Sequence, residues 1–213
     1  MNLTDALDQI GAVRRGLTSL EHAGSPARAL TAEQTYDAPA DDVWDALTNP
    51  ERLPRWFMPI EGELRVGGRY QLVGNAGGTI ERCDPPRSLA VTWEYGDQVS
   101  WVEVDLTEDD GATTLVLRHI ARPDDRWDRY GPGAVGIGWD LSLLGLALHL
   151  ETGASNNPEA FMAWSASEEG QTFMRRSNDD WCAADVADGA DPDDARARAD
   201  RTFAFYTGQE EPA

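Results

Sequence analysis

The stretches YDAPADDVWDALTNPERLPRWF, residues 36–57, and GELRVGGRY, residues 62–70, decide the fold of this chain. Pro39 opens a helical segment in which Asp41 and Asp42 are the candidate cap and first-turn acids. Apolar side chains recur at helical spacing up to residue 47, and Asn49-Pro50 stops the helix. The pattern predicts a second helical turn over residues 51–56 and then two short strands, residues 64–66 and 69–73, around the Gly67-Gly68 turn.

Four further strand patterns follow, with short turns between them, over residues 78–83, 88–95, 98–107 and 113–120. Consecutive strands joined by short turns indicate an antiparallel meander. The glycine-rich residues 74–78 lie between two of these strands and open no helix. They are therefore interpreted as a hairpin loop and not as a phosphate-binding loop.

The strongest helical pattern covers residues 133–151. Trp139, Leu143, Leu146 and Leu150 recur there at intervals of four, three and four residues, which is the spacing of one helix face. An apolar face of this length must pack against another element, and the predicted sheet is the only large partner. The sequence therefore predicts a sheet with one long helix packed on it.

The ends of the chain differ from this central part. Two strand-like segments, residues 12–20 and 27–36, predict an N-terminal hairpin. Residues 151–213 hold 14 acidic residues and 5 arginines, and they predict two polar helices that begin near Ser167 and at Asp191-Pro192. We therefore divide the chain into an N-terminal extension with a hairpin strand (1–30), a central domain (31–152) and an acidic helical extension (153–213).

The quoted stretches resemble the bacterial family related to the C-terminal domain of the activator of heat-shock protein 90 ATPase. Further matches are PPRSLAVTW (85–93), LVLRH (115–119) and Gly138-Trp139, so the resemblance covers residues 31–152. That family belongs to the START-like (SRPBCC) superfamily, which includes lipid-transfer domains, pollen allergens and polyketide cyclases. The resemblance implies an α+β helix-grip fold, in which a curved antiparallel sheet wraps around a long C-terminal helix and encloses a cavity.

Composition excludes several classes of function. The net charge of −20 supplies no basic footprint for nucleic acid or for anionic membrane surfaces. The sequence has no obvious membrane span or signal peptide, so we expect a cytoplasmic protein. Cys83 and Cys182 form no CxxC pair and are both interpreted as buried thiols, and the scattered histidines lack metal-ligand spacing. We therefore expect neither a metal nor a cofactor.

Aromatic and aliphatic side chains are predicted to line the cavity. Leu89, Val91, Trp93 and Tyr95 share one strand face, and Leu115, Leu117 and His119 share another. Such a lining suits a small apolar ligand, lipid-like or aromatic, whose binding energy comes mostly from buried area. The alternative is that these side chains only fill the core. The predicted ligand-binding residues are Trp56, Trp93, His119, Trp139, Leu143 and Leu146.

His119 is the candidate for chemistry. A histidine that faces an apolar cavity can orient a ligand by a hydrogen bond or act as a base, and the commoner alternative is a core histidine with satisfied hydrogen bonds. His149 is predicted to face either the cavity or solvent. No pair of nucleophile and base is visible in the sequence.

Three functions are consistent with these patterns. The first is binding or carriage of a small hydrophobic ligand in the cavity. The second is a cyclase-like or hydratase-like enzyme that uses His119 in the same cavity. The third is a stress-related, co-chaperone-like role in which the protein contacts a protein partner and the cavity is incidental.

Overall fold

The computed structural model describes residues 3–209 and divides into two compact units. The first unit holds Met1–Leu30, Arg122–Leu144 and Asn157–Ala213. The second unit holds Thr31–Ala121 and Gly145–Asn156. One strand and one helix, β2 and α4, continue from one unit into the other.

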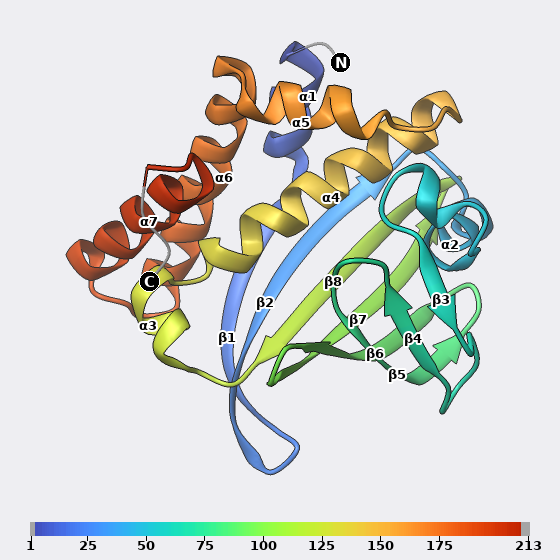
Figure 1. Cartoon of the computed structure of the whole chain (residues 1–213), viewed down its shortest axis with the longest axis horizontal. Helices are drawn as coiled ribbons and strands as arrows, with labels where there is room; N and C mark the ends of the chain where they lie inside the picture. Colours follow the sequence, from blue (N-terminus) through green and yellow to red (C-terminus); the bar gives the residue numbers. More distant parts are fainter. Residues whose placement is uncertain (1–2, 210–213) are drawn as a thin grey trace. The chain divides into compact units, whose positions relative to one another are not determined.

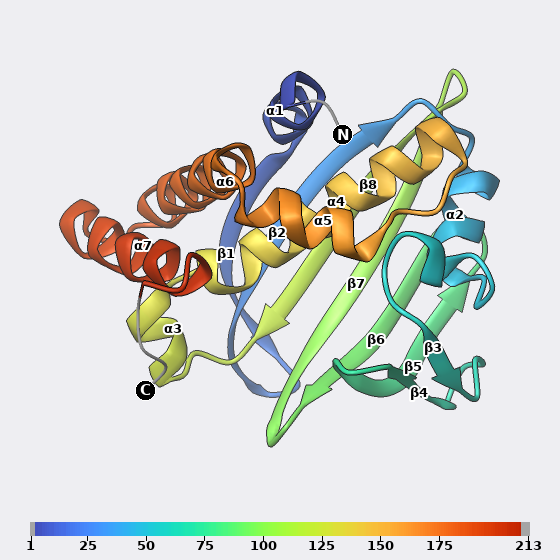
Figure 2. The same cartoon turned by 45° about the horizontal axis from the view of Figure 1, so that its top comes forward.

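The strands form an eight-stranded sheet in the order β1-β2-β8-β7-β6-β5-β4-β3 (Figure 1). From β8 to β3 each strand pairs antiparallel with its neighbour, and Figure 2 shows β5 to β8 side by side. The strands are β1 Arg14–His22, β2 Ser25–Tyr36, β3 Ile60–Gly62, β4 Arg69–Leu72, β5 Gly77–Asp84, β6 Ser88–Tyr95, β7 Gln98–Asp109 and β8 Ala112–Ala121.

Along the chain, helices precede, interrupt and follow these strands. They are α1 Leu3–Ala12, α2 Ala40–Thr48, the 3-10 turn η1 Leu53–Arg55, α3 Asp125–Tyr130, α4 Gly133–Thr152, α5 Pro158–Ala166, α6 Glu168–Ala187 and α7 Pro192–Tyr206. The predicted fold class is confirmed: the protein is α+β, with an N-terminal hairpin, an antiparallel sheet, one long helix after the sheet and further helices at the C-terminal end.

Two hairpins have a two-residue connection with positive φ at both positions. Ala23 and Gly24 join β1 to β2, and Asp110 and Gly111 join β7 to β8, and all four residues have positive φ. Turns of this kind match the right-handed twist of the two strands they join. The Asp110-Gly111 pair therefore fixes the register of β7 against β8, and this register determines which side chains share a face.

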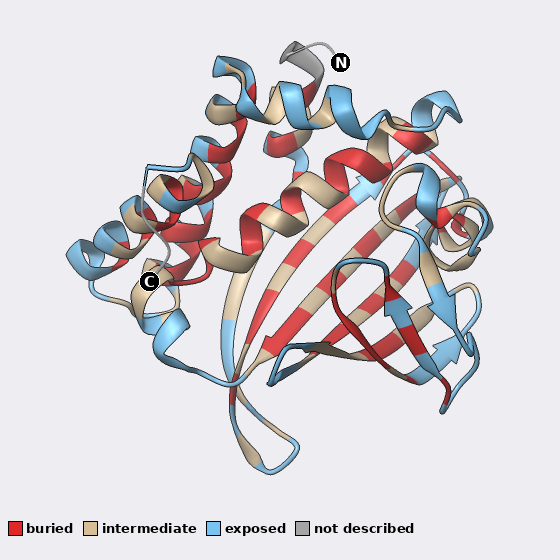
Figure 3. Ribbon diagram, in the orientation of Figure 1, coloured by how far each residue is buried: buried red, intermediate tan, exposed pale blue. Residues whose placement is uncertain are grey.

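In the second unit, side chains alternate between buried and less buried along β2, β7 and β8 (Figure 3). The buried face of the sheet is called the inner face below. Helix α2 contacts β7 and β8, and the first free amide of this helix, that of Ala40, donates to Glu108 Oε2 at 2.7 Å. Pro39 is the N-cap residue and makes no side-chain cap bond, so the cap comes from β7 and not from the predicted acids, which lie in the first turn.

In the first unit, α6 contacts α1, α5, α7 and β1. Its apolar side chains Phe173 and Trp181 are fully buried. Cys182 packs with Ala195 and Ala199 of α7, as predicted for a buried thiol, and burial raises its pKa. The prediction for Cys83 was wrong, because this residue is exposed near the end of β5.

Two other sequence predictions need correction. Residues 64–66 form no strand. The amides of Arg65 and Gly68 bond the carbonyls of Glu63 and Arg65 in tight local turns, and the side chains of residues 64–66 are exposed, so they have no face to bury. Helix α4 is long and apolar enough to cross a membrane by length and composition, which the sequence reading overlooked. More than half of the most apolar window of α4 is buried within the protein, as in the core helix of a globular domain.

Candidate functional site

Three predicted strands of the second unit bring Trp93, Ser100 and His119 together on the inner face. The register places Trp93 of β6 opposite Ser100 of β7, and His119 of β8 opposite Val102, two residues further along β7. The rings of Trp93 and His119 meet edge to face, with 6.4 Å between centroids. His119 Nε2 lies 2.9 Å from Ser100 Oγ, and this hydroxyl donates to the Trp93 carbonyl at 3.1 Å.

These contacts define the state of the imidazole. Because Ser100 gives its only hydrogen to the Trp93 carbonyl, His119 Nε2 is the donor to Ser100 Oγ. Burial lowers the pKa of His119 to about 4, since the charged ring would lose its hydration. His119 is therefore a neutral ring at physiological pH, held by a hydrogen bond to its neighbouring strand.

Apolar side chains surround this polar cluster on the inner face. Val91 lies opposite Val102, Val104 lies opposite Leu117, and all four are buried. The predicted strand faces are thus confirmed for Val91 and Leu117, whereas Val102 and Val104 were not predicted. Tyr95 differs, because it lies at the turn into β7 and is exposed.

The structure places the other predicted site residues elsewhere in the two units. Trp56, just after η1, donates its indole N–H to the Ala46 carbonyl of α2 at 2.8 Å and stacks on Phe57. Leu146 is buried in the part of α4 that belongs to the second unit. Trp139 and Leu143 lie in the part of α4 that belongs to the first unit, where Leu143 is buried and Trp139 half-buried.

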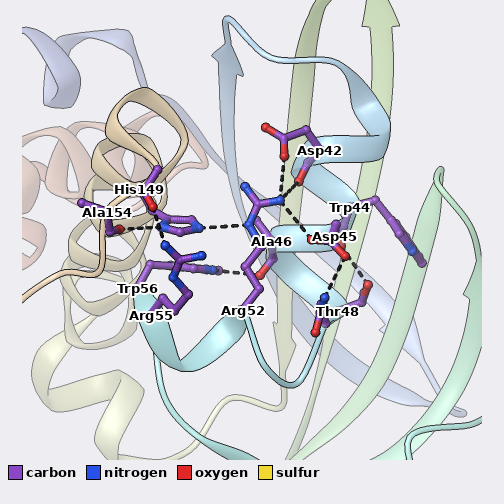
Figure 4. A network of polar contacts seen from close by, with 12 residues as sticks. Asp42, Trp44, Asp45, Ala46, Thr48, Arg52, Arg55, Trp56, His149 and Ala154 are labelled. Carbon is purple, nitrogen blue, oxygen red and sulfur yellow. Dashed lines mark hydrogen bonds and ion pairs between the residues drawn. The ribbon is translucent and has the colours of Figure 1, made fainter.

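A polar network in the second unit holds His149 of α4 (Figure 4). Arg52 Nε donates to His149 Nε2 at 3.0 Å, so His149 Nδ1 carries the hydrogen and donates to the Ala154 carbonyl at 2.7 Å. Arg52 also binds the carboxylates of Asp42 and Asp45 at 2.6 and 3.0 Å. Hydrogen bonds from Asn49 and Arg52 lower the pKa of Asp45.

The contacts of this network show where His149 points, which the sequence left open between the cavity and solvent. Its side chain is fully buried and both ring nitrogens are used, so it faces neither solvent nor a ligand. Arg55 strengthens the same connection: its guanidinium bonds the Gly153 carbonyl, and its own carbonyl accepts from the Asn156 amide at 2.7 Å. The cluster ties the end of α4 to α2 and η1, and its role is structural.

A buried carboxylate in the first unit was missed by sequence reasoning. Asp140 Oδ2 of α4 accepts from Arg15 Nε and from Trp181 Nε1, both at 3.0 Å, and from the Ser177 hydroxyl. Burial raises the pKa of Asp140, and the Arg15 charge opposes this rise. The sequence shows only an acid within an apolar helix, which gives no hint of partners 125 and 41 residues away.

A surface pocket of about 290 Å³ also lies in the first unit, lined by Arg28, Pro123, Trp127, Asp128, Ala190, Asp191 and Arg198. Its two arginines are engaged with acids: Arg198 binds Asp185 at 2.8 Å, and Arg28 lies 3.5 Å from the same carboxylate and stacks on Trp127. Both arginines of this pocket are therefore already paired with carboxylates. Within residues 3–209, no group of three or more potential ligands could hold a metal ion.

Residues 37–151 match the family model of the Activator of Hsp90 ATPase homolog 1-like protein. Among solved structures, CalU16 from Micromonospora echinospora is similar: its solution structure shares 34% identity over 84% of this chain and 97% of its own, with a TM-score of 0.69. Its crystal structure gives 33% identity, 81% and 98% coverage, and a TM-score of 0.64. EF2215 from Enterococcus faecalis, a conserved protein of unknown function, has the same fold at 19% identity, 85% and 96% coverage, and a TM-score of 0.60. No curated protein matches the chain.

Proposed function

The chain belongs to the Activator of Hsp90 ATPase homolog 1-like family of the START-like superfamily, and from this premise we propose that it binds a small, mostly apolar ligand on the inner face of β6, β7 and β8. The observation that carries the proposal is the cluster of Trp93, Ser100 and His119 within buried valine and leucine side chains. Ligand sites in proteins combine an apolar lining with a few placed polar groups. This cluster has both components.

The protonation state of His119 favours binding over catalysis. A general base works best when its pKa lies near the operating pH, and the pKa of His119 is lowered to about 4. A neutral imidazole already hydrogen-bonded to Ser100 is suited to orienting a ligand and is a weak base. The cyclase-like or hydratase-like alternative is therefore the less favoured use of the same face.

A protein-partner role is the second candidate, because the second unit exposes several large apolar side chains: Leu64, Val66, Val73, Tyr95 and Val99. Exposed apolar side chains of this kind favour contact with another protein when they are close together. Arg69 of β4 pairs with Glu94 of β6 at 2.7 Å. Arg69 follows Val66 by three residues, and Glu94 lies beside Tyr95 in β6 and opposite Val99 in β7, so the ion pair links the segments that carry these exposed side chains. A partner that binds these side chains would not depend on the inner face, and this difference separates the two candidates.

The test compares two neighbouring positions on opposite faces of β8. Leu117 faces inward and Val116 faces outward. We expect Leu117→Phe to weaken the binding of 2-naphthol at least tenfold, because the added ring occupies ligand space, and Val116→Phe to leave the affinity unchanged. Isothermal titration calorimetry on the full chain measures both, after circular dichroism shows that each variant is folded.

Equal affinities in the two variants would count against the inner face. The same conclusion would follow if wild-type protein gave no saturable heat with 2-naphthol at millimolar concentration. In either case the exposed apolar side chains would become the leading candidate site.

A further inference from the structure

The inner face carries a further polar side chain, which no function described so far uses. Gln34 of β2 is 2% exposed, and among the described residues its Oε1 has no hydrogen-bond partner. Nearly all buried polar atoms in folded proteins are paired, and an unpaired acceptor destabilises the fold that contains it. A buried oxygen of this kind therefore needs an explanation.

The position of Gln34 follows from a contact on the opposite face. Thr35 Oγ1 lies 2.8 Å from Thr114 Oγ1 of the neighbouring strand β8, so these two side chains share the outer face. Alternate residues of a strand point to opposite faces, which places Gln34 and Leu115 together on the inner face. His119 is four residues from Leu115 along β8, about 13 Å at the usual rise of a strand.

No described side chain donates a hydrogen bond to Gln34 Oε1. Its neighbours on the inner face include Ala32 and Leu115, which are apolar and buried, and Tyr36, which is buried two residues further along β2. Thr113, the next buried residue of β8, gives its hydroxyl hydrogen to the Ala38 carbonyl at 2.7 Å. A trapped water would need several polar partners, whereas Ala32 and Leu115 supply only apolar surface and the Thr113 hydroxyl is already used.

We propose that Gln34 Oε1 accepts a hydrogen bond from a hydroxyl group of the ligand, so that the protein binds an aromatic or polycyclic alcohol. This inference rests on the proposed function and names its substrate class. The apolar body of the ligand lies over Leu117, between the Gln34 end of the inner face and the His119–Ser100 pair. The unpaired acceptor is then satisfied only in the complex, which gives selectivity for a hydroxyl over an ether of the same shape.

The experiment compares two probes that differ only in this donor, 2-naphthol and 2-methoxynaphthalene, by calorimetry on the full chain. We expect wild-type protein to bind 2-naphthol roughly tenfold more tightly, since the ether leaves Gln34 unpaired. Gln34→Met keeps the length of the side chain and removes the acceptor. The variant should therefore bind 2-naphthol more weakly than wild-type protein does, bind 2-methoxynaphthalene as wild-type protein does, and so have equal affinities for the two probes. Gln98→Met, an exposed glutamine of the same unit, is the control and should keep the tenfold preference.

Urea unfolding of the ligand-free variant separates a binding role from a structural one. If Gln34 Oε1 is unpaired until a ligand binds, the urea midpoint of Gln34→Met is unchanged or higher than that of wild type, because an apolar side chain replaces one with an unpaired acceptor. A lower midpoint would mean that Gln34 makes a structural bond, and the inference would be wrong.

The outcomes also distinguish this inference from the proposed function. If both probes bind wild-type protein equally, or if Gln34→Met keeps the preference for 2-naphthol, the choice of an alcohol is overturned while ligand binding stands. If neither probe binds, the proposed function fails and this inference fails with it. The comparison of the two probes on wild-type protein needs no variant, so a folding defect in Gln34→Met cannot hide a preference for the alcohol. Gln34→Leu repeats the variant test with a second apolar side chain.

Discussion

Replacing Arg15 with methionine should lower the free energy of unfolding by about 3–5 kcal/mol, the cost of leaving one member of a buried ion pair without the other. The side chains of Arg15 and Asp140 are 4% and 0% exposed, so water cannot replace the lost partner. In Arg15→Met, the Asp140 carboxylate would keep only the Ser177 and Trp181 donors. Urea unfolding monitored by circular dichroism measures the loss.

The matched control is Arg196→Met, which removes an exposed arginine from its pair with Asp179 in the same unit. An exposed pair contributes at most about 1 kcal/mol, so this variant should be close to wild type. The double variant Arg15→Met/Asp140→Asn should recover part of the loss, since it removes the unpaired charge as well. Similar small losses for Arg15→Met and Arg196→Met would show that the buried pair does not stabilise the first unit.

The pH dependence of the stability of Arg15→Met gives a second measure of the Arg15–Asp140 interaction. Burial already raises the pKa of Asp140, and without the arginine charge the pKa should rise further. As the pH falls toward this raised pKa, the folded state takes up a proton that the unfolded state does not yet bind. The deficit of Arg15→Met relative to wild type should therefore be smaller near pH 5 than near pH 8.

Acidification should destabilise the wild-type protein through His119. Burial lowers the pKa of His119 in the folded state from 6.5 to about 4. Between pH 6.5 and about 4, His119 binds a proton in the unfolded state and not in the folded state, so the free energy of unfolding falls as the pH drops through this range. The loss from this one residue reaches about 3 kcal/mol near pH 4, at 1.36 kcal/mol for each unit of pKa difference.

His119→Gln isolates this contribution, because glutamine keeps a hydrogen-bonding group next to Ser100 and does not titrate. The carboxylates affect both proteins in the same way, so the difference in unfolding free energy between wild type and His119→Gln should shift by about 3 kcal/mol in favour of the variant between pH 7 and pH 4. Parallel curves for the two proteins would mean that His119 is accessible to protons in the folded state.

Local patterns predicted much of the fold because they act over short distances. The long helix α4, the Ser167 cap of α6 and the Asp191-Pro192 start of α7 were all found from the sequence. The predicted single apolar face of α4 was wrong, because this helix is apolar around its whole circumference, and Trp139 and Leu150 are only half-buried. The start of α5 was missed although its signal is present, since Asn157 accepts from the amides of residues 159 and 160 and Pro158 occupies the first helical position. Strand alternation likewise predicted the shared faces that hold Val91, Trp93 and His119.

The candidate site was only partly predictable, because long-range partners leave no local pattern. Nothing near Ser100 in the sequence indicates that it bonds His119, and this contact follows from the register of β7 against β8. The same holds for Arg52, whose partner His149 lies 97 residues away. Gln34 was also missed, since a glutamine within an alternating strand reads as a surface residue until its burial is known.

Nuclear magnetic resonance of the labelled full chain, titrated with 2-naphthol, shows whether a ligand binds on the inner face of the second unit. We expect saturable shifts of the Trp93 indole, the His119 imidazole and the methyl groups of Val102 and Leu117, with the outward-facing Val116 methyl groups unchanged. Saturable shifts confined to exposed residues such as Tyr95 and Val99, or none at millimolar 2-naphthol, would contradict binding on the inner face.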